Sequence, residues 1–140
     1  MRAWGSRSFE NEAARDWAEE MFEHGLPLVE ATLDKTLAVE SKYLTIHDSE
    51  VAIAACEVIA RLFGGYFLPC PDSVKVVRWV DENNQEVQTA TAQKAIAVID
   101  NILSRPNGIF AKWQTGYFKS CWQTNILSIR EQIFVKVSAQ

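Results

Sequence analysis

Apolar residues recur every three or four positions along almost the whole chain, and this is the period of an amphipathic α-helix. In residues 11–24, Trp17, Met21 and Phe22 fall on one stripe, while glutamates occupy the opposite side. The same period predicts further helices at residues 27–41, 49–63, 73–80, 86–104 and 109–137. Helices joined by short loops pack against one another, so we expect an all-α fold, a single compact bundle of five to six helices.

Local signals predict where these helices begin and end. Asn11 is a good N-cap for the first helix, and Gly25 is a typical stop. Residues 133–137 alternate and are rich in β-branched side chains, which also suits a small strand, but helix is the favoured interpretation. The N-caps predicted for the third and fourth helices are Asp48 or Ser49, and then Asp72 or Ser73.

The chain has the length of one domain. It contains 140 residues, 48% of them hydrophobic, and no linker, low-complexity segment or repeat divides it. We expect one domain over residues 1–140, with residues 1–10 as an N-terminal capping loop on a helical bundle of residues 11–137. No apolar run suits a signal peptide or a membrane span, which predicts a cytoplasmic protein that does not bind membranes.

Charge is distributed unevenly along the sequence. The formal net charge is −4, although residues 101–140 carry five Lys or Arg against a single Glu. A net acidic chain argues against a nucleic-acid-binding protein. Residues 10–50 hold eleven acidic residues against five basic ones, histidines included. We therefore expect a cationic protein partner, and the candidate partner-binding residues are Glu19, Glu20, Glu23, Glu30 and Asp34.

No sequence motif for catalysis, cofactor binding or metal binding is found. The cysteines Cys56, Cys70 and Cys121 show no Cys-x-x-Cys spacing, and His24 and His47 have no metal-site spacing. Cys70 stands in a Pro-rich loop that could expose a nucleophilic thiol, but no base is near it in the sequence, and a structural cysteine is favoured. We expect no cofactor, no metal and no catalytic residue.

The first residues contain large apolar side chains where a frayed chain end needs none. Trp4 and Phe9 bracket Gly5 and precede the first predicted helix. We expect a loop that folds back and plugs a gap between helices, with Phe9 as a hydrophobic staple. Asn11 and Asp16 would hold this loop by hydrogen bonds.

Glu57 interrupts the most apolar helix of the chain, and two interpretations stay open. Glu57 and Arg61 have the favourable i,i+4 order, so they could form an ion pair on a thin solvated stripe. Alternatively, Glu57 is a partly buried carboxylate that accepts hydrogen bonds from the N-terminal loop.

The N-terminal stretch resembles the domain-of-unknown-function 4259 family of small bacterial proteins. The residues that match the opening of the family are Met1, Ala3, Trp4, Gly5, Phe9, Glu10, Asn11, Glu12, Ala14 and Asp16. The Ala-rich helix around Glu57 and the spaced Trp113 and Trp122 are similar to two further family features. Arg2 and Arg7 replace family glycines, which makes a glycine-lined ligand site less favourable here. The resemblance implies no assigned function.

Three functions compete on this basis. The leading hypothesis is a non-catalytic protein-binding protein, such as an immunity or antitoxin-like protein that neutralises a basic toxin. The alternative is a structural homo-oligomer, such as a homodimer, with the Trp-rich terminal segment as its interface. The least favoured is a small enzyme that uses Asp16 and Glu57 as an acid/base group.

Overall fold

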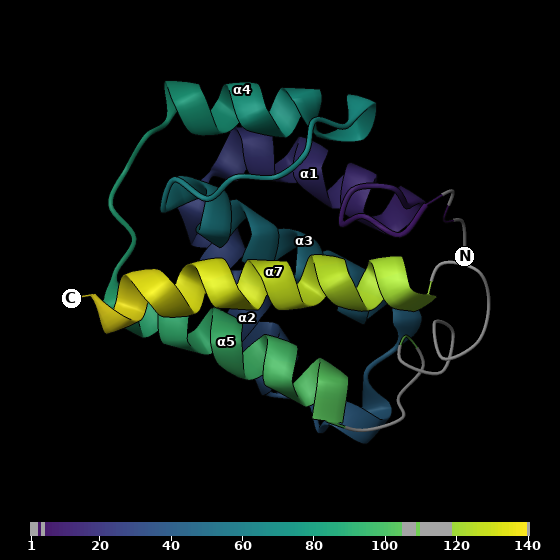
Figure 1. Ribbon diagram of the computed structural model, residues 1–140. Coiled ribbons are helices and arrows are strands. Elements are labelled where there is room, and N and C mark those ends of the chain that lie inside the picture. The colour runs from purple at the N-terminus through teal and green to yellow at the C-terminus, as the bar shows by residue number, and fades with distance from the viewer. Residues whose placement is uncertain (1–2, 4, 105–108, 110–118, 140) are drawn as a thin grey trace.

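The computed structural model describes residue 3, residues 5–104, residue 109 and residues 119–139. Within these ranges the chain forms six α-helices and no strand, apart from an isolated bridge between Ala3 and Asn11, so the predicted all-α bundle is confirmed (Figure 1). The helices are α1 (Glu12–His24), α2 (Leu26–Leu37), α3 (Ile46–Leu62), α4 (Val74–Glu82), α5 (Thr89–Ser104) and α7 (Lys119–Ser138). Two 3₁₀ turns, η1 (Ser41–Tyr43) and η2 (Pro71–Ser73), precede α3 and α4.

Helix α3 lies at the centre of the bundle. It contacts α1, α2, α4, α5 and α7, and twelve of its seventeen residues are buried. Figure 1 shows α7 crossing in front of it. A helix that is apolar on nearly all sides has to be covered on all sides, and the small side chains of α3 let its neighbours approach closely. The remaining helices therefore form a shell around α3.

Most helix ends follow the predicted signals, and one N-cap prediction is wrong. The side chain of Asn11 caps α1, and Gly25 ends that helix with φ 70°. The cap of α3 is Thr45, whose hydroxyl accepts a hydrogen bond from the backbone N–H of Asp48. Asp48 therefore lies in the first turn, and Ser49 is fully buried within the helix. The sequence offers several polar residues in a row here, and propensity alone did not select among them.

Other boundaries differ from the predictions by a few residues. Helix α2 ends at Leu37 rather than at residue 41, and α5 begins at Thr89 rather than at residue 86. The ambiguous residues 133–137 are helical and belong to α7. None of the helices in the described ranges combines the length and the apolar composition that a membrane span requires.

The N-terminal loop is packed onto the bundle through Phe9. This side chain is 2% exposed and belongs to the hydrophobic core. Asn11 fixes the loop, because its Oδ1 accepts from Ala14 N at 2.8 Å and its Nδ2 donates to Ser8 O at 3.2 Å. Asp16 is exposed and forms no such bond to the described part of the loop. Trp4, the other expected plug residue, lies outside the described residues.

We predict that Phe9→Ala lowers the free energy of unfolding by about 3 kcal/mol, because it removes a large buried side chain from the hydrophobic core. Urea denaturation of both proteins measures the difference. Phe134→Ala is the matched control, since Phe134 is 46% exposed and its loss should change stability by less than half as much. Equal effects of the two substitutions would contradict the anchoring role of Phe9.

Candidate functional site

Two hydrogen bonds between Arg7 and Glu10 close the loop that carries Phe9. Oε1 of Glu10 accepts from the backbone N–H of Arg7 at 3.0 Å, and the N–H of Glu10 donates to Arg7 O at 3.1 Å. A Cβ atom on Gly5 would lie 2.5 Å from the Glu10 carboxylate carbon, where a real side chain does not fit. Any other residue at position 5 would displace this flexible carboxylate from its hydrogen bond with Arg7 N.

Arg7 ties this loop to a distant part of the chain. Its Nη1 donates to the carbonyl oxygens of Leu68 and Pro69, at 3.3 and 3.1 Å, in the connector between α3 and α4. Asn125 of α7 adds a second link, because its Nδ2 donates to Ser8 Oγ at 3.0 Å. The loop, the connector and α7 are thus held together by polar contacts over separations of more than 60 residues.

The larger cavity described, of about 720 Å³, lies between these three segments. Its walls include Phe9 from the loop, Glu57 and Arg61 from α3, and Phe67 from the connector. The remaining wall comes from the first half of α7 and is polar, with Ser120, Cys121, Thr124, Asn125 and Ser128. A cavity of this size is in the range that binds small molecules.

Glu57 and Arg61 form a buried ion pair on this wall. Arg61 Nε donates to Glu57 Oε2 at 2.9 Å, and the two side chains are only 11% and 4% exposed. The guanidinium also lies over the ring of Phe67, 4.8 Å from its centroid. The ion pair expected from the i,i+4 spacing is present, but it is buried rather than solvated. Among the described residues, no hydrogen bond joins the N-terminal loop to Glu57.

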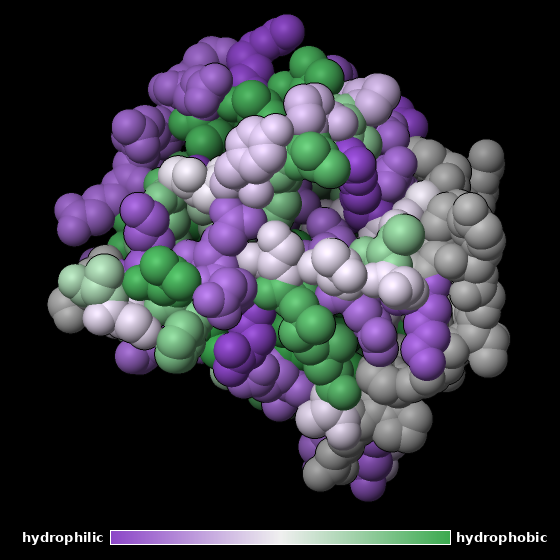
Figure 2. Space-filling model, viewed as in Figure 1, coloured by the Kyte–Doolittle hydropathy of each residue, from purple (hydrophilic) through white to green (hydrophobic). Residues whose placement is uncertain are grey.

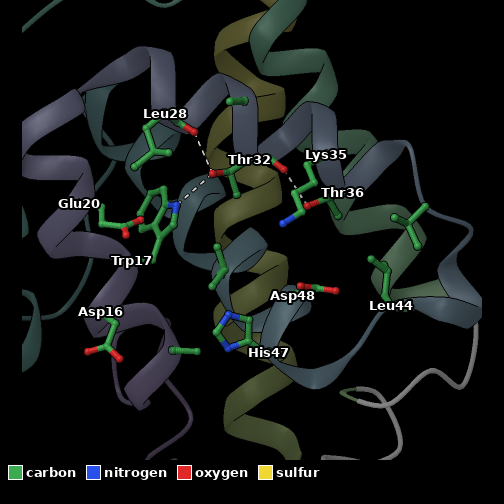
Figure 3. Close-up of a pocket in the computed structure, with 14 residues that line it drawn as sticks. Asp16, Trp17, Glu20, Leu28, Thr32, Lys35, Thr36, Leu44, His47 and Asp48 are labelled. Carbon is green, nitrogen blue, oxygen red and sulfur yellow. Dashed lines mark hydrogen bonds between the residues drawn. The ribbon is translucent and has the colours of Figure 1, made fainter.

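A smaller cavity, of about 370 Å³, opens between α1, α2 and the start of α3 (Figure 3). Its inner wall is the ring of Trp17, whose indole N–H donates to Thr32 Oγ1 at 3.0 Å. Figure 3 shows Asp16 and Glu20 from α1 on one side of this cavity and Asp48 from α3 on the other. The basic side chains that line the same cavity are Lys35 and His47.

The two cavities separate the residues that the acid/base hypothesis combined. Asp16 lines the smaller cavity and Glu57 the larger one, so the structure does not bring these carboxylates into one site. Glu57 instead has Arg61 as its partner, and Asp16 has Glu20 and Asp48 as its acidic neighbours around one cavity.

Four of the five candidate partner-binding residues already have contacts within the chain. Glu19 pairs with Lys75 at 3.2 Å and Asp34 with Lys94 at 2.7 Å, and this hydrogen bond raises the pKa of Lys94. The other two contacts are weaker: Glu30 accepts from Thr91 at 3.0 Å, and Glu23 lies 4.0 Å from His24. Glu20, the fifth residue, lines the smaller cavity. Basic residues of the same chain thus neutralise part of the acidic surface. The carboxylates of Asp16, Glu20 and Asp48, in contrast, line the smaller cavity.

Sequence reasoning missed one group of metal-type ligands. Donor atoms of Glu10, Cys70 and Asp72 lie within 4.8 Å of one another. No local spacing could have shown this, because about 60 residues separate Glu10 from Cys70. Glu10, one of the three, also accepts the hydrogen bond from Arg7 N within the loop.

The three cysteines differ in their environments. Cys56 is fully buried in α3, where its thiol lies 3.5 Å from Ala95 O, and burial raises its pKa well above the ordinary value. Cys70 is buried at 8% exposure and Cys121 is exposed. A thiol reagent should therefore distinguish them.

Comparison with known proteins gives one match. The model of the family described as domain of unknown function (DUF4259) matches residues 2–125, most of the chain. The chain belongs to this family. No curated protein and no solved structure matches it significantly. Arg7, one of the two arginines at which the opening stretch departs from the resemblance, makes the loop-to-connector contacts described above.

We predict that Glu57→Gln lowers the free energy of unfolding by about 3 kcal/mol, because it leaves the Arg61 guanidinium without its buried counter-charge. The same substitution in the exposed pair, Glu19→Gln, should change stability by less than about 1 kcal/mol. Urea denaturation measures both. Adding Arg61→Met to Glu57→Gln should recover part of the loss; a double variant no more stable than the single one would contradict a stabilising pair.

We also predict that one thiol reacts with Ellman's reagent in the folded protein at neutral pH. The exposed Cys121 should react first, and Cys121→Ser should remove this fast phase. Cys56 should react only after unfolding in urea, because its thiol is both inaccessible and hard to ionise. Fast reaction in Cys121→Ser would show that another cysteine is more accessible than the structure indicates.

Proposed function

We propose that this protein is a non-catalytic, cytoplasmic binding protein that captures a cationic protein partner. A basic toxin, neutralised in the manner of an immunity or antitoxin-like protein, is the kind of partner that fits best. The observation that supports this proposal is the acidic rim of the smaller cavity, where Asp16, Glu20 and Asp48 surround the wall formed by Trp17.

The chemistry of this cavity suits the side chain of an arginine or a lysine. Three carboxylates against Lys35 leave a net negative charge around the opening when His47 is neutral. An aromatic wall beneath carboxylates attracts a cation through the ring quadrupole as well as through ion pairing. The cavity of about 370 Å³ is large enough for one such side chain and small enough to exclude most of a folded partner.

The rest of the acidic surface would act at longer range. Glu19, Glu23 and Asp34 are exposed, so they contribute to the field of the molecule even though bases lie near them. Such a field raises the rate of encounter with a cationic partner, while the anchored side chain in the cavity would slow dissociation. Affinity would therefore depend mainly on Asp16, Glu20 and Asp48, the carboxylates that line the smaller cavity.

We predict that the triple variant Asp16→Asn, Glu20→Gln, Asp48→Asn loses a partner that the wild type captures from the native cell, with affinity at least about tenfold weaker. Affinity capture with mass spectrometry identifies the partner, and titration calorimetry measures the affinity. The matched control is Asp81→Asn, Glu82→Gln, Glu86→Gln, which removes the same charge from exposed positions outside both cavities.

The control variant should bind like the wild type. An equal loss of affinity in both triple variants would show that only the net charge of the protein matters. It would contradict a role for the smaller cavity. Capture of the same chain alone would favour the homo-oligomer instead. The exposed apolar residues Leu127, Phe134 and Val135 on α7 would then contribute to its interface, since Trp122 is buried and Trp113 lies outside the described residues.

A further inference from the structure

The ion pair in the larger cavity leaves hydrogen-bonding atoms open. Arg61 uses Nε for Glu57 Oε2, and within the described part of the chain neither Glu57 Oε1 nor the terminal nitrogens of Arg61 form a hydrogen bond. Both side chains line the larger cavity. A donor side chain and an acceptor side chain therefore border the same space of about 720 Å³.

We propose that this cavity binds a small uncharged molecule through an amide edge, meaning a hydrogen-bond acceptor next to a donor on one planar group. The acceptor would meet the terminal nitrogens of Arg61, and the donor would meet Glu57 Oε1. Such a ligand satisfies both open groups and leaves the ion pair intact. The cavity is separate from the acidic one proposed for a protein partner, so the two proposals can fail independently.

The charge balance favours a neutral ligand over an ion. The charged residues that line the cavity are Arg7 and Arg61 against Glu10 and Glu57, which cancel. Arg7 and Glu10 are occupied with backbone groups of the loop and the connector. An anion would compete with Glu57 for Arg61, and a cation would compete with Arg61 for Glu57, so either would bind at the expense of the pair.

The walls of the cavity suit a ligand with a flat apolar part. Phe9 is buried beneath it, and Phe67 carries the guanidinium of Arg61 on its ring. Tyr66, at 71% exposure, lines the cavity beside Phe67. Aromatic rings and a few well-placed polar groups are the usual lining of small-molecule sites.

The cavity is also held in shape before any ligand arrives. Gln132 of α7 accepts from Tyr66 N at 2.7 Å and donates to Tyr66 O at 3.0 Å, which fixes the connector. Asn125 of α7 fixes the N-terminal loop through Ser8. A preformed site pays little ordering entropy when it binds, so even a fragment should bind measurably. In Figure 1, the loop and the connector both lie above α7.

The test uses three probes that share one ring and differ in charge: benzamide, benzoate and benzamidine. Each is titrated into the ¹⁵N-labelled protein, and chemical-shift changes are followed by NMR. Benzamide should shift the amide signals of residues that line the cavity, and benzoate and benzamidine should bind at least tenfold more weakly. No binding of benzamide at millimolar concentration, or tighter binding of either ion, would overturn the proposal.

Variants locate the binding and separate it from stability. Thr124→Trp fills the cavity from an exposed position on α7 and should abolish benzamide binding. Leu127→Trp, on the same helix but outside the cavity, should not change it. Arg61→Met should weaken binding at least tenfold in a protein that still melts cooperatively. Binding that survives Thr124→Trp unchanged would place the ligand elsewhere and overturn the proposal.

Two sources of an amide edge can then be compared. Uracil presents it on a heterocyclic ring, as nucleobases do, and propionamide presents it as a primary carboxamide, as a glutamine side chain does. The probe that binds more tightly identifies the source, and either result supports an amide-edge site. Binding of neither uracil nor propionamide, together with no binding of benzamide, would overturn it.

Discussion

The complete enclosure of α3 is the constraint on which the rest of this structure depends. Five helices pack against it, and a helix covered on all sides can carry a charged side chain only if that charge is compensated within the fold. Glu57 and Arg61 meet this condition for each other, one turn apart. The pair is therefore both a consequence of the packing and the feature that makes the wall of the larger cavity polar. If α3 were exposed to water, the carboxylate of Glu57 would be solvated and would not need Arg61 as a counter-charge.

Helices were predictable from this sequence, and contacts between distant segments were not. The 3.6-residue period gave α1 to α5 and most of α7 because each helix is amphipathic or wholly apolar over many residues. The N-cap of α3 was misplaced because Thr45, Asp48 and Ser49 are all good capping residues, and only the tertiary structure selects among them. The two interpretations of Glu57 could not be separated, because spacing predicts a partner but not the burial of the pair.

The cavities lay beyond sequence reasoning for a physical reason. The larger one is formed where residues 5–10, 57–70 and 120–128 meet, and no local pattern encodes such a meeting. The smaller one combines Asp16 and Glu20 with Asp48, which belongs to another helix. Charge counting did locate the acidic region, but it selected Glu19, Glu30 and Asp34, whose carboxylates the fold uses for internal contacts. Net charge describes the whole surface. A binding site depends on the carboxylates that are not already paired with bases of the same chain.

Figure 2 shows the face that carries α7, with hydrophobic side chains visible over α4 and between α5 and α7. On this molecule the N-terminal loop has two separate functions in the fold. Phe9 anchors it in the core, and Arg7 bonds it to the connector at Leu68 and Pro69. A glycine at position 7 would keep the Phe9 anchor but lack this second attachment. Arg7 thus holds the loop and the connector together along the wall of the larger cavity, which Glu57 and Arg61 also line.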